Sequence, residues 1–274
     1  MPSFHIDTEN CDQDGRCVRS CPGKVIQLDP KTKYPVATPD YETHCLVCGH
    51  CVAVCPTSAF EMDSIHPDTC PPIREDFDVS ASQAEQFLRS RRSIRNFKNR
   101  PVEREKLEKL LEIACYAPSA KNCQPWNWIV VQDSKEVHRL ASMVVDWMGT
   151  IIEQFPEEAE ARGFNRVVAA WEDGNERICR GAPHVIVCHG DKDYVMGAED
   201  GALALGYLEL FAPVLGLGAC WGGYLYSAVN WHPPLFKALG LPQGHRAYGA
   251  MMVGYPQLKY QRLPVRNAPK VAWR

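Results

Sequence analysis

The sequence lacks long hydrophobic runs and a leader segment in which basic residues precede an apolar stretch. Its longest apolar-rich stretch, residues 202–217, is interrupted by Glu209, Pro213 and several glycines. A membrane-spanning helix needs about 20 nearly continuous apolar residues, and a secretory leader needs the basic start that is missing here. We therefore expect a protein that makes no contact with a membrane and that works in the cytoplasm.

Cysteine, by contrast, is abundant and unevenly distributed. Seven of the 13 cysteines lie in the first fifth of the 274-residue chain. In a reducing compartment, closely spaced cysteines bind metals or clusters rather than form disulfides. This shift in composition predicts a small cysteine-rich domain (residues 1–66), a proline-containing linker (residues 67–80) and a larger domain (residues 81–274).

Charge is also divided between these parts. Residues 1–78 carry six Lys/Arg against thirteen Asp/Glu, a net of −7, whereas residues 79–274 carry 24 against 20, a net of +4. The asymmetry favours an acidic module that meets basic partners, joined to a body that holds an anionic group. Ordinary solvation of two surfaces would give the same pattern.

The spacing of the early cysteines is specific. The run from Cys45 to Pro56 reads C-x2-C-x2-C-x3-C-P, a pattern typical of bacterial ferredoxins that bind cubane iron–sulfur clusters. The run from Cys11 to Pro22 repeats this spacing, with Asp14 in the place of the second cysteine. Zinc sites usually pair their ligands two and two across a longer gap. Two clusters are therefore predicted, and zinc is the weaker interpretation.

The resemblance to two-cluster ferredoxins implies a crossed ligand set. One four-iron cluster would be held by Cys21, Cys45, Cys48 and Cys51, and a second cluster by Cys11, Cys17 and Cys55, with or without Asp14. Asp14 precedes Gly15, which also suits an ordinary turn and would leave three thiolates and a three-iron cluster. Both interpretations of Asp14, as ligand and as turn residue, stay open.

The larger domain combines helical and strand patterns, so the expected fold class is α+β. Capping-box spacing at Ser82 and Glu85 predicts a helix that runs to about Ser90, and residues 102–116 have helical apolar spacing. Residues 198–217 form a nearly all-apolar helical segment, suited to burial at the centre of a domain or a dimer. Strands are predicted for three β-rich runs, residues 128–131, 185–187 and 250–253.

Four segments follow one another in a characteristic order: residues 91–97 (Arg-Arg-Ser-Ile-Arg-Asn-Phe), 117–126 (which include Asn-Cys-Gln-Pro-Trp), 215–223 (which end Trp-Gly-Gly) and 253–264. This succession resembles the FMN-dependent nitroreductase family over about residues 81–266. The resemblance implies bound FMN and a homodimer in which residues 118–122 of one subunit reach the flavin of the other. The implied FMN-binding residues are Arg91, Arg92, Ser93, Arg95, Pro118, Ser119, Asn122, Trp221, Gly222, Gly223 and Arg262.

The residue types suit these roles. Between Arg89 and Lys106 there are eight basic residues and two acidic ones, and guanidinium groups bind phosphate through paired hydrogen bonds. A nucleic-acid surface would interleave aromatic side chains, which this stretch lacks, so we expect no nucleic-acid partner. A solvated helix face is the remaining alternative. Some relatives have an acidic residue where this chain has Gly222, which leaves the potential of the flavin open.

We therefore expect an FMN-dependent oxidoreductase. Electrons would pass from a one-electron donor such as ferredoxin, through the clusters and the flavin, to a small electron-poor acceptor such as a nitroaromatic, a quinone or an activated alkene. Two other functions share the same residues: an electron carrier or flavin-binding regulator without a substrate, and chemistry on flavin itself or on a halogenated aromatic. No catalytic side chain is selected by the sequence, and Tyr224 or solvent could donate a proton.

Overall fold

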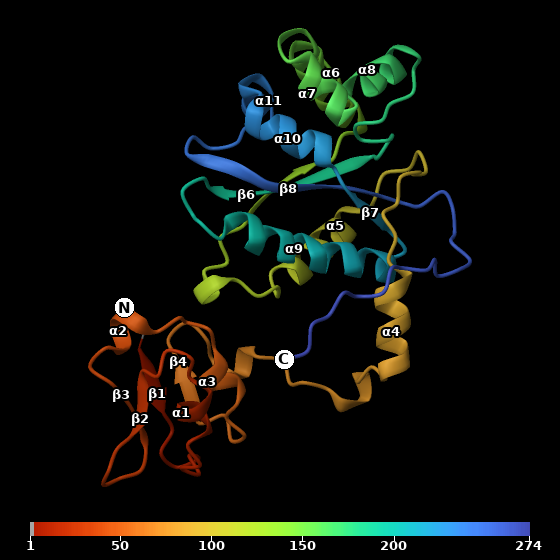
Figure 1. The fold of residues 1–274 in the computed structure, drawn as a ribbon. Helices are drawn as coiled ribbons and strands as arrows, with labels where there is room; N and C mark the ends of the chain where they lie inside the picture. The colour runs from red at the N-terminus through yellow and green to blue at the C-terminus, as the bar shows by residue number, and fades with distance from the viewer. Residues whose placement is uncertain (1–2) are drawn as a thin grey trace. The chain divides into compact units, whose positions relative to one another are not determined.

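The computed structural model describes residues 3–274 of the chain. Its internal contacts divide these residues into two compact units, which can be followed by colour in Figure 1. The first unit comprises the described residues up to Val79 together with Lys121–Cys123, and the second comprises Ser80–Ala120 and Gln124–Arg274.

The first unit is built from two small antiparallel sheets and three short helices. Strand β1 (Phe4–Ile6) pairs with β4 (Phe60–Met62), and β2 (Ile26–Leu28) pairs with β3 (Pro35–Ala37). One-turn helices α1 (Arg16–Ser20), α2 (Tyr41–His44) and α3 (His50–Ala53) carry or precede the cysteines. The apolar core is small, with Phe4 stacked on Phe60 at a centroid distance of 4.6 Å. A unit of this size buries too little apolar surface to be stable without cross-links such as bound metals or disulfides.

Two short 3-10 turns, η1 (Pro67–Thr69) and η2 (Glu75–Phe77), follow this unit and lead to α4 (Ala81–Ser90). The capping box of α4 is formed by Ser80 and Gln83, not by Ser82 and Glu85 as the spacing suggested. The reason is that Ser80 has extended backbone angles and its hydroxyl accepts from the Gln83 N–H, so the helix already includes Ser82. Sequence spacing alone could not separate these overlapping candidates.

The second unit is centred on a four-stranded antiparallel sheet with the order β5-β6-β8-β7. Its strands are β5 (Asn127–Val131), β6 (His184–Asp191), β7 (Gly218–Trp221) and β8 (His245–Gly254). Seven consecutive residues of β6 are buried, because helices cover both faces of the sheet. The α+β fold class is confirmed.

The two faces of the sheet carry different helices (Figure 1). One face packs against α5 (Arg104–Ala114) and α9 (Gly197–Phe211). The other packs against α6 (Ser134–Gln154), α10 (Gly223–Trp231) and α11 (Pro233–Ala238), with α7 (Pro156–Arg162) and α8 (Phe164–Glu172) beyond α6. Within residues 3–274, no helix is both long and apolar enough to cross a membrane.

The apolar helix predicted for residues 198–217 is shorter than expected. It ends at Phe211 and continues as a 3-10 turn, η4 (Ala212–Leu215). Pro213 has no N–H to continue the helical hydrogen bonds, and Gly216, at φ 73°, turns the chain into β7. Residues 218–221 are thus an edge strand of the sheet, which the many glycines of this segment had concealed.

The tail after β8 begins with ordered backbone contacts and then loses regular structure. Lys98 N–H donates to Tyr255 O at 2.8 Å, and Gln257 N–H donates to Asn96 O at 2.9 Å. Beyond Gln257 the residues are exposed and assigned to no helix or strand. The start of the tail is therefore tied to the basic segment, residues 91–97.

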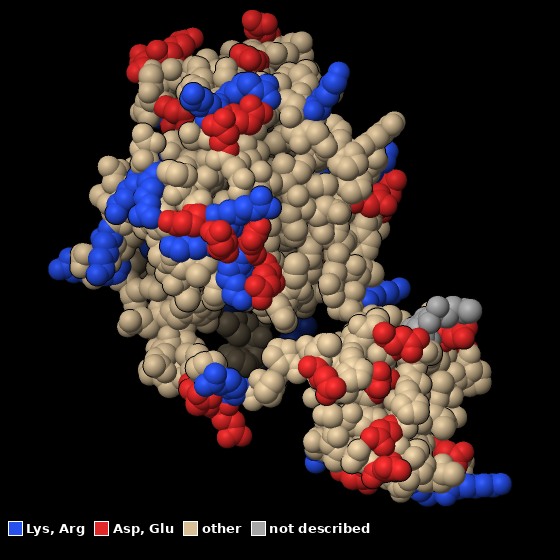
Figure 2. All heavy atoms as spheres, turned by 180° about the vertical axis from the view of Figure 1, so that it is seen from behind, with Lys and Arg blue, Asp and Glu red and all other residues tan. Residues whose placement is uncertain are grey.

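Side-chain charge differs between the two units as the sequence indicated. On the face drawn in Figure 2, acidic side chains predominate on the first unit, whereas both signs are mixed on the second.

Candidate functional site

The basic segment, residues 91–97, lies extended against the edge strand β7. Ile94 N–H donates to Ala219 O at 2.9 Å, and the Ile94 side chain packs directly on Gly218, where an added Cβ would lie 2.5 Å from Ile94 Cγ1. Side chains alternate along an extended segment. Ser93 and Arg95 therefore project to the side opposite Ile94, where a ligand could reach both.

Arg91 is held by a buried carboxylate that the sequence analysis did not single out. Its Nη1 donates to Glu209 Oε1 at 2.9 Å and to Ser93 Oγ at 3.3 Å, and Glu209 is only 8% exposed. This pair fixes the Arg91 guanidinium but also neutralises its charge. The available signal was a single acidic residue within an otherwise apolar helix, α9, since such a residue needs a buried partner.

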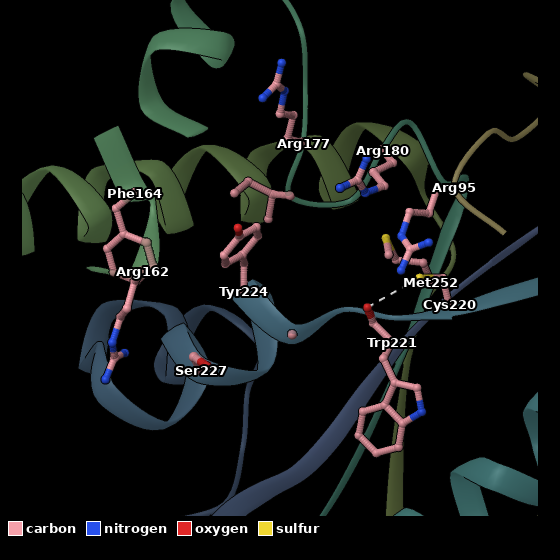
Figure 3. A pocket seen from close by; sticks show the side chains of 12 residues that line it. Arg95, Arg162, Phe164, Arg177, Arg180, Cys220, Trp221, Tyr224, Ser227 and Met252 are labelled. Atoms are coloured by element: carbon pink, nitrogen blue, oxygen red, sulfur yellow. Dashed lines mark hydrogen bonds between the residues drawn. The ribbon is translucent and has the colours of Figure 1, made fainter. Parts of the chain in front are cut away.

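A cavity of about 440 Å³ opens beside Arg95 (Figure 3). Arg95 and Arg180 approach its end at Cys220, and neither forms an ion pair with a carboxylate anywhere in residues 3–274. Burial raises the pKa of the Cys220 thiol, and the nearby Arg95 and Arg180 oppose that rise. The full lining comprises Arg95, Arg162, Phe164, Arg177, Ile178, Arg180, Cys220, Trp221, Gly223, Tyr224, Ser227 and Met252.

Arg180 is a second residue that sequence reasoning missed. It lies 85 positions after Arg95 in the sequence, outside every quoted segment, and no spacing rule connects the two. Only the fold brings this loop, in which Arg180 has a φ of 58°, to the end of β7. Two guanidinium groups without carboxylate partners make this end of the cavity strongly attractive to an anionic or electron-rich group.

Trp221, Gly222 and Gly223 form the turn from β7 into α10. Gly222 N–H is used within the sheet and donates to Ala250 O at 2.9 Å. An added Cβ would meet nothing within 4 Å at Gly223 and only an ordinary contact at Gly222. The chain's own packing therefore does not require either glycine, and the space beside them is open. The first N–H groups of α10 begin here, and helix N-termini attract electron-rich groups.

The C-terminal tail returns to the start of the basic segment. The Arg92 guanidinium lies 5.5 Å from the centre of the Tyr260 ring, and a cavity of about 400 Å³ is lined by Arg89 and Arg91 on one side and by residues 263–266 on the other. Arg262 itself is exposed. The tail thus brings the Arg262 region to Arg91, although 170 positions separate them.

The segment predicted to serve the other subunit is held by its own chain. Ser119 Oγ accepts from Gln124 N–H at 2.9 Å, and Ala120 N–H donates to the Asp200 carboxylate at 3.1 Å. Asn122 has a φ of 56° and belongs to the residues grouped with the first unit. Neither Pro118 nor Ser119 lines the Arg95 cavity of the same chain.

The first unit contains two further cavities, and each gathers cysteines from both sequence runs. The first is lined by Cys21, Cys45, Cys48 and Cys51. The second is lined by Cys11, Cys17, Cys55 and Asp14. Within the described residues, no three Cys, His, Asp or Glu side chains converge on a point that a single metal ion could occupy. In each cavity the cysteines border a common space.

Burial affects the acidity of these groups. It raises the pKa of Cys17 to about 11 and that of Cys51 to about 12, so both thiols stay protonated at neutral pH without a bound cation. Metal binding replaces such protons and so couples to folding. Burial and the neighbouring Cys45 likewise raise the pKa of the Tyr41 hydroxyl.

Asp14 has a local role in addition to its place at the second cavity. Its Oδ1 accepts from Arg16 N–H at 2.8 Å, and its Oδ2 lies 2.8 Å from Arg16 Nε. The carboxylate therefore caps the turn into α1, which is the turn role considered above, while it borders the space between Cys11, Cys17 and Cys55.

Known proteins agree with this combination of features. Residues 88–255 match the nitroreductase family and residues 9–72 match the 4Fe-4S dicluster domain. The chain belongs to the nitroreductase family, and it is an FMN-dependent oxidoreductase with an N-terminal 4Fe-4S ferredoxin domain.

Individual relatives are distant. An FMN reductase (NAD(P)H) of Bacillus subtilis is 30% identical over 184 residues, which cover 65% of this chain and 68% of the relative. An iodotyrosine deiodinase of Thermotoga neapolitana is 27% identical over 62% of this chain and 87% of its own length. A nitroreductase of Desulfitobacterium hafniense, solved with bound FMN, is similar with a TM-score of 0.57 and 25% identity over 69% of this chain and 96% of that structure.

Proposed function

We propose that the chain passes electrons from two iron–sulfur clusters through FMN to a small electron-poor acceptor such as a nitroaromatic, a quinone or an activated alkene. The observation that carries this proposal is the cavity beside β7, where two guanidinium groups without carboxylate partners, Arg95 and Arg180, lie next to the open Gly222–Gly223 turn. A one-electron supply and a ligand-sized cavity in one chain support an enzyme more than a carrier without a substrate.

FMN fits the residues present. Its phosphate would be held by Arg91, Ser93, Arg95 and Arg262, with Arg91 positioned by Glu209. Arg92 would face the ribityl chain and the edge of the ring. The ring would lie beside the Trp221–Gly223 turn, with Pro118, Ser119 and Asn122 of a second subunit on its far side. When bound, FMN exchanges one electron at a time with clusters and two with an organic acceptor.

The protein's own groups would orient the flavin and shape its surroundings. Arg180 would favour any negative charge that develops on the ring edge, because no carboxylate of residues 3–274 pairs with its guanidinium group. Phe164 and Tyr224 line the same cavity and meet edge-on, with ring centroids 6.2 Å apart. They give the acceptor an aromatic wall.

The two cysteine cavities fit two clusters with the crossed ligand set. Cys21, Cys45, Cys48 and Cys51 would hold a four-iron cluster, and Cys11, Cys17 and Cys55 would hold a second, in which Asp14 is the fourth ligand or leaves a three-iron form. Each cavity is lined by cysteines from both runs, which supports this assignment. We further propose residues 1–66, 67–80 and 81–274 as cluster domain, linker and flavin domain, and a homodimer as the active form.

The flavin assignment is tested by charge reversal. Arg95→Glu and Arg262→Glu should each weaken FMN binding, because a charge-assisted phosphate contact contributes about 1.5–3 kcal/mol, or roughly 10- to 150-fold in Kd. Arg104→Glu is the control, since Arg104 is exposed and, among residues 3–274, pairs with Glu108 on its own helix alone. Retention of FMN is measured by absorbance after gel filtration at micromolar protein.

Equal FMN content in all three variants would contradict the assignment of Arg95 and Arg262 to the FMN phosphate. For the acceptor, the anaerobically reduced protein is mixed with nitroaromatics, quinones and activated alkenes, and flavin reoxidation is followed. A protein that binds FMN yet reduces none of these faster than free FMN would contradict the proposed activity.

A further inference from the structure

The hydroxyl group of Tyr41 is buried in the first unit without a hydrogen-bond partner. The residue is 4% exposed, and among residues 3–274 no nitrogen or oxygen atom forms a hydrogen bond with Tyr41 Oη, although the Cys45 thiol lies beside it. Leaving a buried hydroxyl unpaired costs about 1–3 kcal/mol, and buried polar groups are rarely left in this state. The hydroxyl therefore needs an acceptor, and the sulfur of Cys45 is the side-chain group placed beside it.

The backbone fixes where this side chain lies. Tyr41 is the first residue of α2, its N–H donates to Thr38 O at 3.0 Å, and its carbonyl accepts from Cys45 N–H at 2.9 Å. Its ring meets the Phe4 ring edge-on, with centroids 5.1 Å apart. Held in this way, Tyr41 lines the same cavity as Cys45 and Cys51.

We propose that Tyr41 donates a hydrogen bond to the Cys45 sulfur when the cluster is bound, and that this bond raises the reduction potential of that cluster. The inference rests on the cluster assignment proposed above. A tyrosine hydroxyl, with an ordinary pKa of about 10, is protonated at neutral pH and can donate, and a cluster-bound cysteine is a thiolate that can accept.

The direction of the effect follows from charge. Reduction adds one electron, and part of its charge falls on the ligating sulfurs. A fixed donor stabilises the more negative state more strongly, and hydrogen bonds to the sulfurs are among the factors that set cluster potentials. Tyr41 would thus make the cluster bound by Cys21, Cys45, Cys48 and Cys51 easier to reduce than the other cluster, provided that their remaining surroundings are equivalent.

The test is Tyr41→Phe in the full chain, assembled anaerobically and titrated with reductant while the reduced clusters are followed by electron paramagnetic resonance. This substitution removes the hydroxyl oxygen alone, so the ring can keep its contact with Phe4. We expect the ratio of reduced to oxidised cluster, at a fixed potential, to fall three- to tenfold, and tenfold corresponds to 59 mV for one electron. The second cluster is an internal reference and should not shift.

Tyr34→Phe is the matched control, because the Tyr34 hydroxyl already donates to Thr8 O at 3.1 Å and Tyr34 does not line the cavity. An unchanged midpoint potential in Tyr41→Phe would overturn the proposal, and so would loss of the cluster from this variant, since the hydroxyl would then be needed for assembly rather than tuning. Iron analysis of the unmodified protein separates these results from failure of the cluster assignment: a chain without iron would overturn that assignment and this inference together.

Discussion

At the scale of single residues, Asp14 combines a turn-capping role with a place at the second cysteine cavity. Its carboxylate is already engaged by the Arg16 N–H and guanidinium, and a carboxylate binds iron less firmly than a soft thiolate does. Both facts weaken the fourth ligand position next to Cys11, Cys17 and Cys55. The second cluster should consequently convert between four-iron and three-iron forms more easily than the first.

We predict that Asp14→Cys will suppress this conversion. A thiolate at position 14 completes a set of four cysteines, so mild oxidation should no longer release one iron. The three-iron resonance, recorded by electron paramagnetic resonance after oxidation with ferricyanide, should lose most of its intensity relative to the unmodified protein. Thr8→Cys, at an exposed position that does not line this cavity, is the control. Eight irons that resist oxidation in the unmodified protein would contradict a labile site.

What the sequence predicted about the site depended on local spacing. The cysteine runs and the residues 91–97 are contiguous, so their ligand types could be assigned before any fold was known. Glu209 and Arg180 were missed because each reaches the site through tertiary packing, and no periodicity links α9 or the loop before β6 to Arg91 and Arg95. Tyr41 was missed for a related reason, since only burial reveals that its hydroxyl is unpaired.

At the scale of secondary structure, α9 presents apolar side chains on two sides. Ala204, Leu205 and Leu208 are buried against the sheet, while Leu203 and Tyr207 are 45% and 40% exposed. Leu203 and Tyr207 are spaced i and i+4, so they share one face. This exposed face supports the proposed homodimer, because contiguous apolar patches on a protein surface mark interaction sites.

We predict that Leu203→Asp will dissociate the dimer. A buried leucine contributes about 1.5–3 kcal/mol, and a two-fold interface contains the residue twice, so the dimer Kd should rise roughly 100-fold or more. Sedimentation velocity of the FMN-loaded protein measures the change. Val195→Asp, at an exposed loop position, should leave the assembly intact. An unmodified protein that sediments as a monomer with FMN bound would show that the dimer proposal is wrong.

One central strand of the sheet carries a buried histidine whose protonation is disfavoured. His189 on β6 is 5% exposed, and its Nδ1 lies 3.0 Å from His245 Nδ1 on β8. Burial, and then the neighbouring His245, lower the pKa of His189 below its usual value of 6.5. The unfolded chain therefore binds more protons, so the stability that neutral His189 contributes is present above pH 6.5 and is lost as the pH falls below it.

We predict that the unfolding temperature will fall between pH 7.5 and pH 5.5, and that His189→Asn will reduce this slope. Asparagine does not titrate in this range, so the proton uptake on unfolding is smaller by the share that belongs to His189. Circular dichroism at several pH values measures the slope, with His138→Asn, a change at an exposed histidine on α6, as the control. Equal slopes in all three proteins would contradict a buried neutral His189.

Element types were easier to predict than their ends. Long periodic segments such as α5 (Arg104–Ala114) and the central strands follow from apolar spacing, because burial fixes one face of each. The ends of helices depend on local groups. Ser80 and Ser82 are both possible caps for the start of α4, and Pro213 ends α9 after Phe211. β7 was hidden because its Gly218 accommodates the Ile94 side chain of the neighbouring basic segment, a need that strand propensity does not encode.

At the scale of the whole molecule, one chain combines a cysteine-rich unit and a flavin-binding unit. An enzyme that took electrons only from NAD(P)H would have no need of clusters, because a nicotinamide can stack on the flavin and transfer a hydride directly. Clusters accept single electrons, and their potentials span a range that includes values low enough to reduce flavin. A covalent link also raises the effective concentration of donor at the acceptor. We therefore expect the clusters to be the point at which electrons enter.

Removal of the cluster unit should separate flavin binding from electron supply. We predict that a shortened chain that begins at Asp78 will keep FMN and be reduced by dithionite, but will lose turnover with reduced ferredoxin as donor. Cys48→Ser, which removes one ligand of the first cavity, should behave in the same way. Cys70→Ser is the matched control, because Cys70 is exposed and lies outside both cysteine cavities. Turnover is measured anaerobically as acceptor consumed per FMN. If the shortened chain turns over as fast as the whole chain with every one-electron donor, the clusters have a structural or regulatory role instead, because the flavin then receives its electrons without them.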